Sequence, residues 1–251
     1  MYKVLDKDTI EMEIVPHIPL PKRGFAPTAP LCEIVNAILY KLKTGVQWEY
    51  LPTTSLFSQK VLSWQSVYHH YRKWCRSGTF LDCWTGILKR YRDMFDLSSV
   101  DLDGSHTPAI RGGEAVEYQG RKKGRTTNAL FLTDRQGLPL AMSEPVSGNH
   151  NDLFDIEVQF EVVTATLDRA DIKTQGLFLN ADAGFDSKDF RSACARRDIN
   201  ANICFNKRNG SVDDRDEYFD QGLYDQRYAV ERTNAWIDSF RSLLNRFDTT
   251  I

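Results

Sequence analysis

Three carboxylate side chains stand in sequence settings that favour metal chemistry. Asp103 lies in the segment VDLDGSHTP, Asp182 in FLNADAGFDS and Glu231 in YDQRYAVERTNAW. Carboxylates that converge on one point repel each other unless a cation joins them, and oxygen ligands without His or Cys suit Mg²⁺ or Mn²⁺. Two such ions about 4 Å apart activate a water or a 3′-hydroxyl and stabilise the leaving oxygen in phosphodiester cleavage. The residue types therefore predict metal-dependent cleavage of a phosphodiester.

Each aspartate has a neighbour that could replace it. Asp101 is two residues before Asp103, so both face the same side of a strand, but Asp103 is nearer the expected strand end. Asp186 is a similar reserve for Asp182. Asp before Gly at a strand end is also ordinary turn chemistry. The prediction therefore depends on the joint placement of the carboxylates.

The third segment predicts a final helix over about residues 224–247 with two unlike sides. At about 100° per residue, Tyr224, Arg227 and Asp238 fall within roughly 40° of Glu231. Because Arg227 is four residues before Glu231, it can orient that carboxylate or contact a phosphate; a solvated surface pair is the plainer alternative. We expect the opposite, apolar side to be buried against a sheet, and it consists of Ala229, Trp236, Ile237, Phe240, Leu243, Leu244 and Phe247.

The elements that must position these carboxylates are expected from residue 97 onward. The sequence predicts three strands, in LSSVDLDGS, TTNALFLTD and LPLAMSEPV. Then follow a helix in NDLFDIEVQFEVVTATLDRA, a strand in GLFLNADAG, a helix in SKDFRSACARRD and a strand in INANICFN. This order describes an α/β fold with a mixed sheet covered by helices, which matches the RNase H-like fold. Sites in open α/β sheets form at the carboxyl ends of strands, where both aspartates are expected.

The first part of the chain has a different pattern. Residues 1–30 are Pro-rich and predict an irregular arm. Residues 31–95 predict short helices with tight turns, typical of a helix-turn-helix domain that binds DNA, with a plain helical bundle as the alternative. Residues 1–95 hold 13 Lys and Arg against 8 Asp and Glu, whereas residues 96–251 hold 19 against 26. A basic DNA-contacting part beside an acidic metal-binding part fits this asymmetry, although chance variation would also produce it.

Composition excludes several classes of protein. No apolar run among the 251 residues approaches the length of a transmembrane helix, and the charged N-terminus is no signal peptide. The five cysteines are scattered and form no C-x-x-C pair, which disfavours a zinc knuckle or a disulfide framework. A cytoplasmic protein without a membrane partner is expected.

One further stretch suits nucleic acid. The Gly-containing loop after Asp103 carries five cations, Arg111, Arg121, Lys122, Lys123 and Arg125. We expect this loop to bind phosphate without sequence preference, while an exposed charged loop is the alternative. His106 and His150 lie near predicted strand ends, where ordinary hydrogen bonding is the expected role.

Together, DGSHTPA, NADAGFDS and YDQRYAVERTNAW resemble the three catalytic segments of DDE transposases from bacterial insertion sequences. The resemblance is to the insertion-sequence-five group of the insertion-sequence-four-like superfamily. The last segment fits the family signature Y-x2-R-x3-E at Tyr224, Arg227 and Glu231. GVQWEYLP and SWQSVYHHYRKWCRSGTF resemble the helical DNA-binding region that precedes the catalytic core in that group.

The resemblance implies roles for these residues. Asp103, Asp182 and Glu231 would be the catalytic triad that binds Mg²⁺ or Mn²⁺, and Tyr224 and Arg227 would lie close to the DNA phosphates at the cut. The implied activity is cleavage of double-stranded DNA at the inverted repeats of the element and joining of a 3′-hydroxyl to target DNA. A homodimer on DNA is expected, because two ends must be held together.

Two departures from the family leave alternatives open. Asp238 stands where the family often has a Lys, and the chain stops at NRFDTTI, earlier than its relatives. The catalytic domain, residues 96–251, is therefore expected to be truncated at its C-terminus. One alternative is a truncated, inactive copy that only binds the inverted repeats. Another is a metal-dependent phosphoesterase on the same fold.

Overall fold

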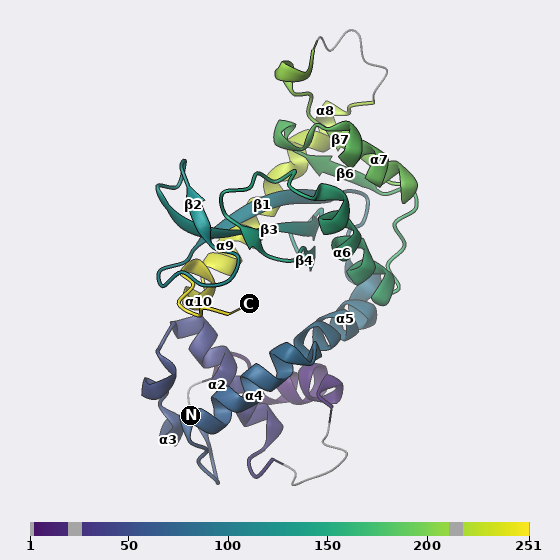
Figure 1. The fold of residues 1–251 in the computed structure, drawn as a ribbon. Coiled ribbons are helices and arrows are strands. Elements are labelled where there is room, and N and C mark those ends of the chain that lie inside the picture. Colours follow the sequence, from purple (N-terminus) through teal and green to yellow (C-terminus); the bar gives the residue numbers. More distant parts are fainter. Residues whose placement is uncertain (1–2, 20–26, 211–217, 251) are drawn as a thin grey trace. The chain divides into compact units, whose positions relative to one another are not determined.

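The computed structural model describes residues 3–19, 27–210 and 218–250. The chain divides into two compact units, Met1–Arg90 with Ser239–Leu243, and Tyr91–Asp238 with Leu244–Ile251 (Figure 1). The first unit is helical, and the second contains the sheet and the three carboxylates.

The helices predicted for the first unit are present. They are α2 (Leu31–Thr44), α3 (Thr53–Leu56), α4 (Trp64–Arg76) and α5 (Thr79–Tyr91). The α2 helix ends at Gly45, whose φ of 70° is a left-handed conformation that glycine adopts without strain. The α4 helix is capped by Ser63, whose side chain accepts from the backbone N–H of Ser66. Val67 and Trp74 bury its inner face.

The irregular arm predicted over residues 1–30 is wrong for residues 7–17. A short helix α1 (Lys7–Thr9) continues through a π-turn, Ile10–Ile14, into the 3₁₀ turn Val15–His17. Ile10 and Ile18 are buried in the core of this unit, so the apolar residues of the segment find partners that a Pro-rich composition does not indicate. Part of the predicted arm, residues 1–2 and 20–26, lies outside the described residues.

The second unit contains one mixed, seven-stranded sheet. Its strand path is β2–β3–β1–β6–β7, and β4 and β5 also pair with β3. The strands β1 and β3 are antiparallel, whereas β1, β6 and β7 are parallel. The bounds are β1 Val100–Pro108, β2 Glu117–Gln119, β3 Gly124–Asp134, β4 Pro139–Met142, β5 Val146–Ser147, β6 Phe178–Ala181 and β7 Asn200–Ile203.

This topology confirms the predicted fold class. A long antiparallel hairpin followed by parallel strands on the other side of β1 is the RNase H-like arrangement. The sequence patterns missed β2 and β5, because strands of three and two residues are too short to show alternation. The crossover helices α6 (Ile156–Arg169) and α7 (Lys188–Arg196) follow the predicted segments.

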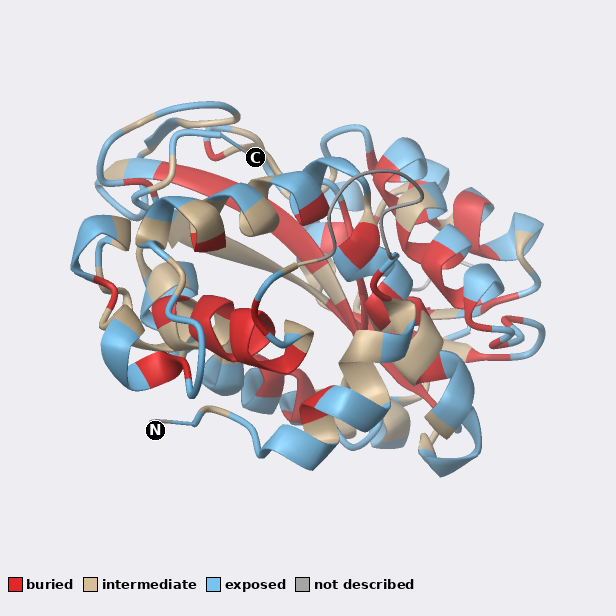
Figure 2. Ribbon diagram, turned by 90° about the horizontal axis from the view of Figure 1, so that it is seen from below, coloured by how far each residue is buried: buried red, intermediate tan, exposed pale blue. Residues whose placement is uncertain are grey.

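The buried core of the second unit lies between the strands and these helices (Figure 2). Leu102 and Leu179 come from neighbouring strands, and Phe185 and Phe190 come from the turn and helix after β6; all are fully buried. Phe190 packs edge-on against Phe160 of α6 with ring centroids 5.1 Å apart. These contacts anchor the residues around Asp182 to the core.

The single final helix predicted over residues 224–247 is wrong. The segment begins as α8 (Gln221–Tyr224), tightens into a 3₁₀ turn, Asp225–Tyr228, and continues as α9 (Ala229–Asp238), which is followed by α10 (Arg241–Leu244). Its buried residues are Ala229, Val230 and Thr233. Four residues of the predicted apolar side are exposed instead, namely Trp236, Leu243, Leu244 and Phe247. A 3₁₀ turn advances about 120° per residue, so a constant 100° period does not predict the buried face.

Two predictions made from composition concern membrane-spanning helices and the cysteines. Among the described residues, no helix has the length and apolar character needed to cross a membrane. The five cysteines all lie in the described residues and form no disulfide there, and Cys32, Cys83 and Cys194 are buried.

Candidate active site

The two predicted aspartates lie side by side in the sheet register. Asp101 of β1 pairs with Asn180 of β6, so extending the parallel register by two residues places Asp103 beside Asp182. The expectation that Asp103 ends its strand is wrong, because β1 continues to Pro108 along β3. What ends at this level is β6, whose last residue is Ala181.

Asp182 occupies the turn that follows β6. Its Oδ1 accepts from the backbone N–H of Gly184 at 2.8 Å, which caps the 3₁₀ turn Ala183–Phe185. Its other carboxylate oxygen has no hydrogen-bond donor among the described residues. Asp182 therefore caps a turn, as the alternative interpretation of Asp before Gly predicts. Its second oxygen remains available to a ligand.

Arg227 and Tyr224 approach this pair from the last helical segment. Arg227 Nη1 lies 3.8 Å from Asp103 Oδ2, and both side chains are 21% exposed. The guanidinium also lies over the ring of Tyr224, 5.8 Å from its centroid. The same Nη1 is buried and has no hydrogen-bond partner among the described residues. A buried, unsatisfied donor beside two carboxylates is suited to an anionic ligand such as a phosphate.

The electrostatics of Asp103 link all three predicted carboxylates. Burial raises the pKa of Asp103 from 3.8 to about 6, while Arg227 and the backbone N–H of Gly104 oppose the rise. The charges of Asp182 and Glu231 both raise this pKa further. The charges of Asp182 and Glu231 therefore both act on Asp103, as like charges do.

Glu231, unlike the half-buried Asp103 and Asp182, is exposed. It lies in the first turn of α9. In the described part of the chain, no group of three His, Cys, Asp or Glu side chains lies close enough to hold a metal ion. The assignment of Asp103, Asp182 and Glu231 as a joint set of metal ligands therefore stays a prediction. Asp238, further along α9, is exposed.

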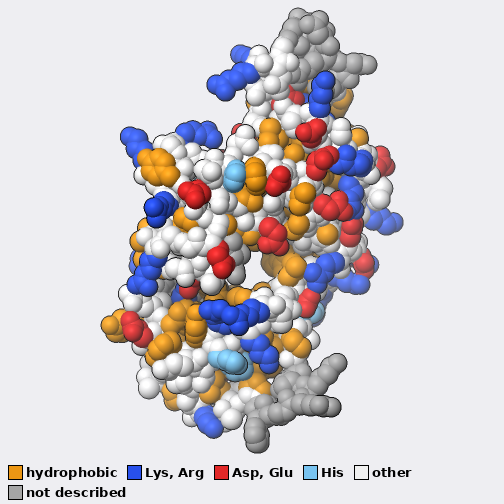
Figure 3. Space-filling model, viewed as in Figure 1, with side chains coloured by type: hydrophobic (Ala, Val, Ile, Leu, Met, Phe, Trp, Pro, Cys, Tyr) orange, Lys and Arg blue, Asp and Glu red, His pale blue; other side chains and the backbone are white. Residues whose placement is uncertain are grey.

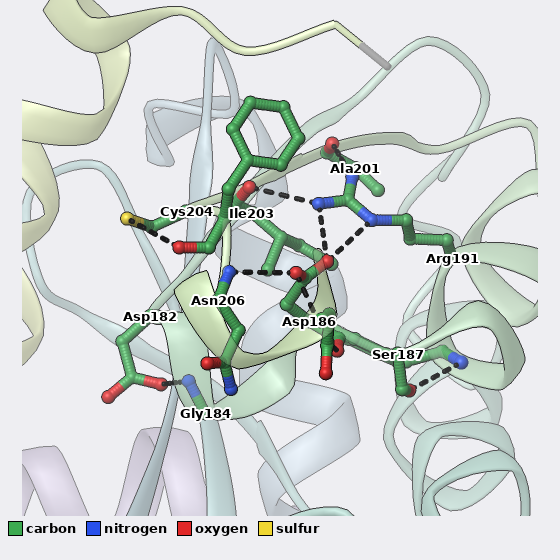
Figure 4. A network of polar contacts seen from close by, with 12 residues as sticks. Asp182, Gly184, Asp186, Ser187, Arg191, Ala201, Ile203, Cys204 and Asn206 are labelled. Carbon is green, nitrogen blue, oxygen red and sulfur yellow. Dashed lines mark hydrogen bonds and ion pairs between the residues drawn. The ribbon is translucent and has the colours of Figure 1, made fainter. Parts of the chain in front are cut away.

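The two reserve aspartates are engaged elsewhere. Asp101 is buried and accepts from Asn180 Nδ2 at 2.9 Å. Asp186 is buried, and its Oδ1 accepts from Arg191 Nε and Nη2 at 3.1 and 2.9 Å. Its Oδ2 accepts from the backbone N–H of Asn206 at 2.8 Å. Figure 4 shows that the carboxylates of Asp182 and Asp186 lie apart and contact different groups. Asp186 is thus occupied by structural contacts and is not a substitute for Asp182.

We predict that Asp186→Asn lowers the free energy of unfolding by roughly 3–5 kcal/mol, because it leaves the Arg191 guanidinium buried without its counter-charge. Urea unfolding measures this loss. The matched control is Asp189→Asn, a change at an exposed position in the first turn of α7, which is expected to change stability by less than about 0.5 kcal/mol. Equal stability of the two variants would contradict the structural role of Asp186.

The predicted basic loop is the tip of a β-hairpin. Arg121, Lys122 and Lys123 lie between β2 and β3, and Arg125 lies on β3; all four are exposed. Arg111 is also exposed, in the segment before β2. Arg121 and Lys122 lower the pKa of His106, so the tip lies near β1. Lys and Arg side chains gather around the place of this hairpin in Figure 3.

The two histidines make ordinary contacts. His106 Nδ1 lies 3.1 Å from Thr126 Oγ1, and burial lowers the pKa of its ring. The ring of His150 stacks on Phe154 with a centroid distance of 3.5 Å. Neither contact indicates a catalytic role.

Two asparagines of this region were missed by the sequence analysis. Asn180 and Asn202 are fully buried on β6 and β7 and are hydrogen-bonded to each other, with Asn202 Nδ2 2.7 Å from Asn180 Oδ1. The available signal was an asparagine inside each of two short strands, FLNA and NANI, the second of which also begins with the exposed Asn200. A buried polar side chain requires partners.

Comparison with known proteins gives two family matches. Residues 102–251, more than half of the chain, match the family "DDE superfamily endonuclease". Residues 12–84 match the family "Putative transposase of IS4/5 family". A comparison with curated protein sequences gave no significant match.

The chain is also similar to two solved structures at 12% identity and a TM-score of 0.32 in each case. The "Mos1 transposase paired-end complex with left transposon end" covers 92% of this chain, which covers 84% of that one. For the "Crystal structure of the Mos1 mariner paired end complex with Mn" the shares are 96% and 87%. A TM-score of this size does not establish a common fold by itself.

Proposed function

The chain belongs to the DDE superfamily of endonucleases, and from that premise we propose that it is a transposase that cuts DNA at the ends of its insertion sequence and joins them to target DNA. The observation that carries the proposal is the meeting of Asp103, Asp182 and Arg227 at the end of β6. Two neighbouring carboxylates and a guanidinium N–H without a hydrogen-bond acceptor among the described residues suit a cation and a phosphate at one place.

The donor set fits a hard divalent cation. Asp103 and Asp182 would hold it, and Glu231, whose charge already acts on Asp103, would join them from α9. Endonucleases of this superfamily use divalent metal ions; Mg²⁺ or Mn²⁺ suits oxygen ligands. When bound there, the cation would supply Lewis-acid activation of the attacking water or 3′-hydroxyl and charge stabilisation for the leaving oxygen.

The remaining groups bind and orient the DNA. The buried Nη1 of Arg227 donates to a phosphate oxygen at the cut, and the ring of Tyr224 holds the guanidinium against Asp103. The exposed cations of the β2–β3 hairpin bind neighbouring phosphates. The helical domain around α4 binds the inverted repeats, and two copies of the chain hold two DNA ends together.

The test is a cleavage assay on a labelled duplex that carries the inverted repeat of the protein's own element. We expect a cut at the repeat end with Mg²⁺ or Mn²⁺, no cut with EDTA, and no cut in a duplex with a scrambled repeat. Binding of the repeat without cleavage under either metal would favour an inactive copy that only binds DNA. Equal cleavage of both duplexes would favour a general phosphoesterase.

The hairpin makes a separate prediction about salt. In Lys122→Gln/Lys123→Gln, the slope of log affinity for duplex DNA against log salt concentration should become shallower by about 1–2, since each lost phosphate contact removes roughly 0.9. Fluorescence anisotropy at several salt concentrations measures the slope. Lys173→Gln/Lys188→Gln removes the same charge from exposed positions elsewhere and should leave the slope unchanged. Equal slopes for both double variants would exclude the hairpin as a phosphate contact.

A further inference from the structure

A continuous row of buried polar contacts crosses three strands beneath the site. On β1, Asp101 Oδ1 accepts from Asn180 Nδ2 of β6 at 2.9 Å. Asn180 Oδ1 accepts from Asn202 Nδ2 of β7 at 2.7 Å. Asn202 Oδ1 in turn accepts from the backbone N–H of Asp220 at 2.7 Å. We call the row Asp101–Asn180–Asn202–Asp220 the polar ladder.

The ladder has a fixed direction. The side-chain carbonyl of each Asn accepts a hydrogen bond from one neighbour, and its NH₂ group donates one to the other. Neither amide can therefore rotate without breaking two hydrogen bonds. The second N–H of each amide is also used, from Asn180 Nδ2 to the carbonyl of Leu223 at 3.3 Å and from Asn202 Nδ2 to the carbonyl of Asp220 at 3.0 Å. Buried networks in which every donor is satisfied specify one arrangement of their elements.

The ladder ends on the first turn of α8. Asp220 caps that helix, with its Oδ1 2.9 Å from the backbone N–H of Leu223. Three contacts therefore join the amides of Asn180 and Asn202 to the backbone of Asp220 and Leu223. Tyr224 comes next in the chain, and Arg227 and Glu231 follow within about two helical turns.

The other end of the segment is tied to the turn between β3 and β4. Thr233 Oγ1 donates to the carbonyl of Gly137, and Arg232 Nη1 donates to the carbonyl of Gln136. Between these two attachments lie the 3₁₀ turn Asp225–Tyr228 and the first turn of α9. The position of Arg227 over Asp103 thus depends on where the ladder fixes α8.

We propose that Asn180 and Asn202 are positioning residues for the DNA-cutting reaction, because they fix α8 on the sheet so that Arg227 meets Asp103 and Glu231 follows on the same side. The inference rests on the proposed function. The asparagines contact neither DNA nor metal, and they act through the segment that carries Tyr224, Arg227 and Glu231.

A purely structural role for the ladder makes a different prediction. If the ladder only stabilised the fold, a variant that still folds would keep the full cleavage rate and the full affinity for metal. If it positions the last segment, the folded variant loses cleavage rate and metal affinity but keeps its affinity for DNA, which the rest of the chain also binds.

The experiment compares Asn202→Ala with wild type and with Asn200→Ala. Asn200 lies on the same strand, is exposed and takes no part in the ladder. Single-turnover cleavage at saturating DNA, DNA affinity, and Mn²⁺ affinity without DNA by electron paramagnetic resonance are measured on protein shown to be folded by circular dichroism. For Asn202→Ala we expect about a 10–100-fold loss in cleavage rate and in Mn²⁺ affinity. DNA affinity should stay within twofold, and Asn200→Ala should match wild type.

A second substitution covers the case in which Asn202→Ala does not fold. Asn202→Ser keeps a hydroxyl inside the sheet, but its side chain is too short to contact the backbone of Asp220 as the amide does, so cleavage and Mn²⁺ affinity should fall as in Asn202→Ala. Cleavage and Mn²⁺ binding within twofold of wild type in a folded Asn202→Ala or Asn202→Ser variant would overturn the inference. A wild-type protein that neither cuts nor binds Mn²⁺ would overturn the proposed function itself, and this inference with it.

Discussion

Asp103→Asn is expected to reduce metal-dependent cleavage of the repeat end by at least about 10³-fold while leaving repeat binding within a few-fold of wild type. The amide is nearly the same size as the carboxylate but lacks the charge that holds a divalent cation. Losing the principal electrostatic stabilisation of a phosphoryl-transfer site costs roughly this much. Single-turnover cleavage in Mg²⁺ and in Mn²⁺, with a gel-shift assay for binding, measures both effects.

The same substitution should stabilise the metal-free protein at neutral pH. Burial raises the pKa of Asp103 to about 6 in the folded chain, so its ionised form opposes folding above that pH. A rise of roughly two pKa units corresponds to at most about 3 kcal/mol. The penalty is present above pH 6 and disappears as the pH falls through 6 toward 3.8, where the carboxylate is protonated in both states. Asp103→Asn removes it at every pH.

Thermal unfolding in EDTA at pH 7.5 and at pH 4.5 checks this second effect. The variant should melt higher than wild type at pH 7.5, and most of the difference should vanish at pH 4.5. Added Mg²⁺ should stabilise wild type and have little effect on the variant. A variant that keeps its cleavage rate, or that gains stability from Mg²⁺ as wild type does, would remove Asp103 from the metal site.

The sequence predicts the strands of this site better than its last helical segment. Asp103 and Asp182 are found from strand patterns and following glycines, because alternation and turn residues are local properties. Their lateral pairing follows from the parallel register of β1 and β6, which local pattern does not determine. The site lies where β6 ends, and at that point the longer strand β1 continues along β3. Asp103 therefore lies within β1 and not at its end.

The last segment shows why a fixed helical period does not predict its buried face. The 3₁₀ turn at Asp225–Tyr228 changes the angular spacing, so Val230 and Thr233 are buried while Trp236 is exposed. Arg227 was expected to orient Glu231 or bind phosphate, and in the structure it pairs with Asp103 on a strand 124 residues earlier in the chain. The partner of Arg227 depends on the ladder that fixes α8, and the pairing of its asparagines across two strands is not a local property of the sequence.

Arg227→Ala is expected to reduce cleavage by about 10²-fold at pH 8, since it removes a donor placed for the phosphate beside the carboxylates. Arg227→Lys should recover little of this loss, because an ammonium lacks the planar group that lies over Tyr224. The matched control is Arg208→Ala. Arg208 is an exposed arginine of the 3₁₀ turn Lys207–Asn209, so its loss should leave the cleavage rate within a few-fold of wild type.

The pH dependence identifies how Arg227 acts. Its charge lowers the pKa of Asp103, so in Arg227→Ala this pKa should rise above about 6. The acidic limb of the cleavage profile and of Mn²⁺ affinity should then move to higher pH, and the deficit relative to wild type should be larger at pH 6.5 than at pH 8. Arg208→Ala should keep the wild-type profile. A deficit in Arg227→Ala that is equal at all pH values would mean that Arg227 contacts the phosphate without acting on Asp103, and an unchanged rate would place the DNA elsewhere.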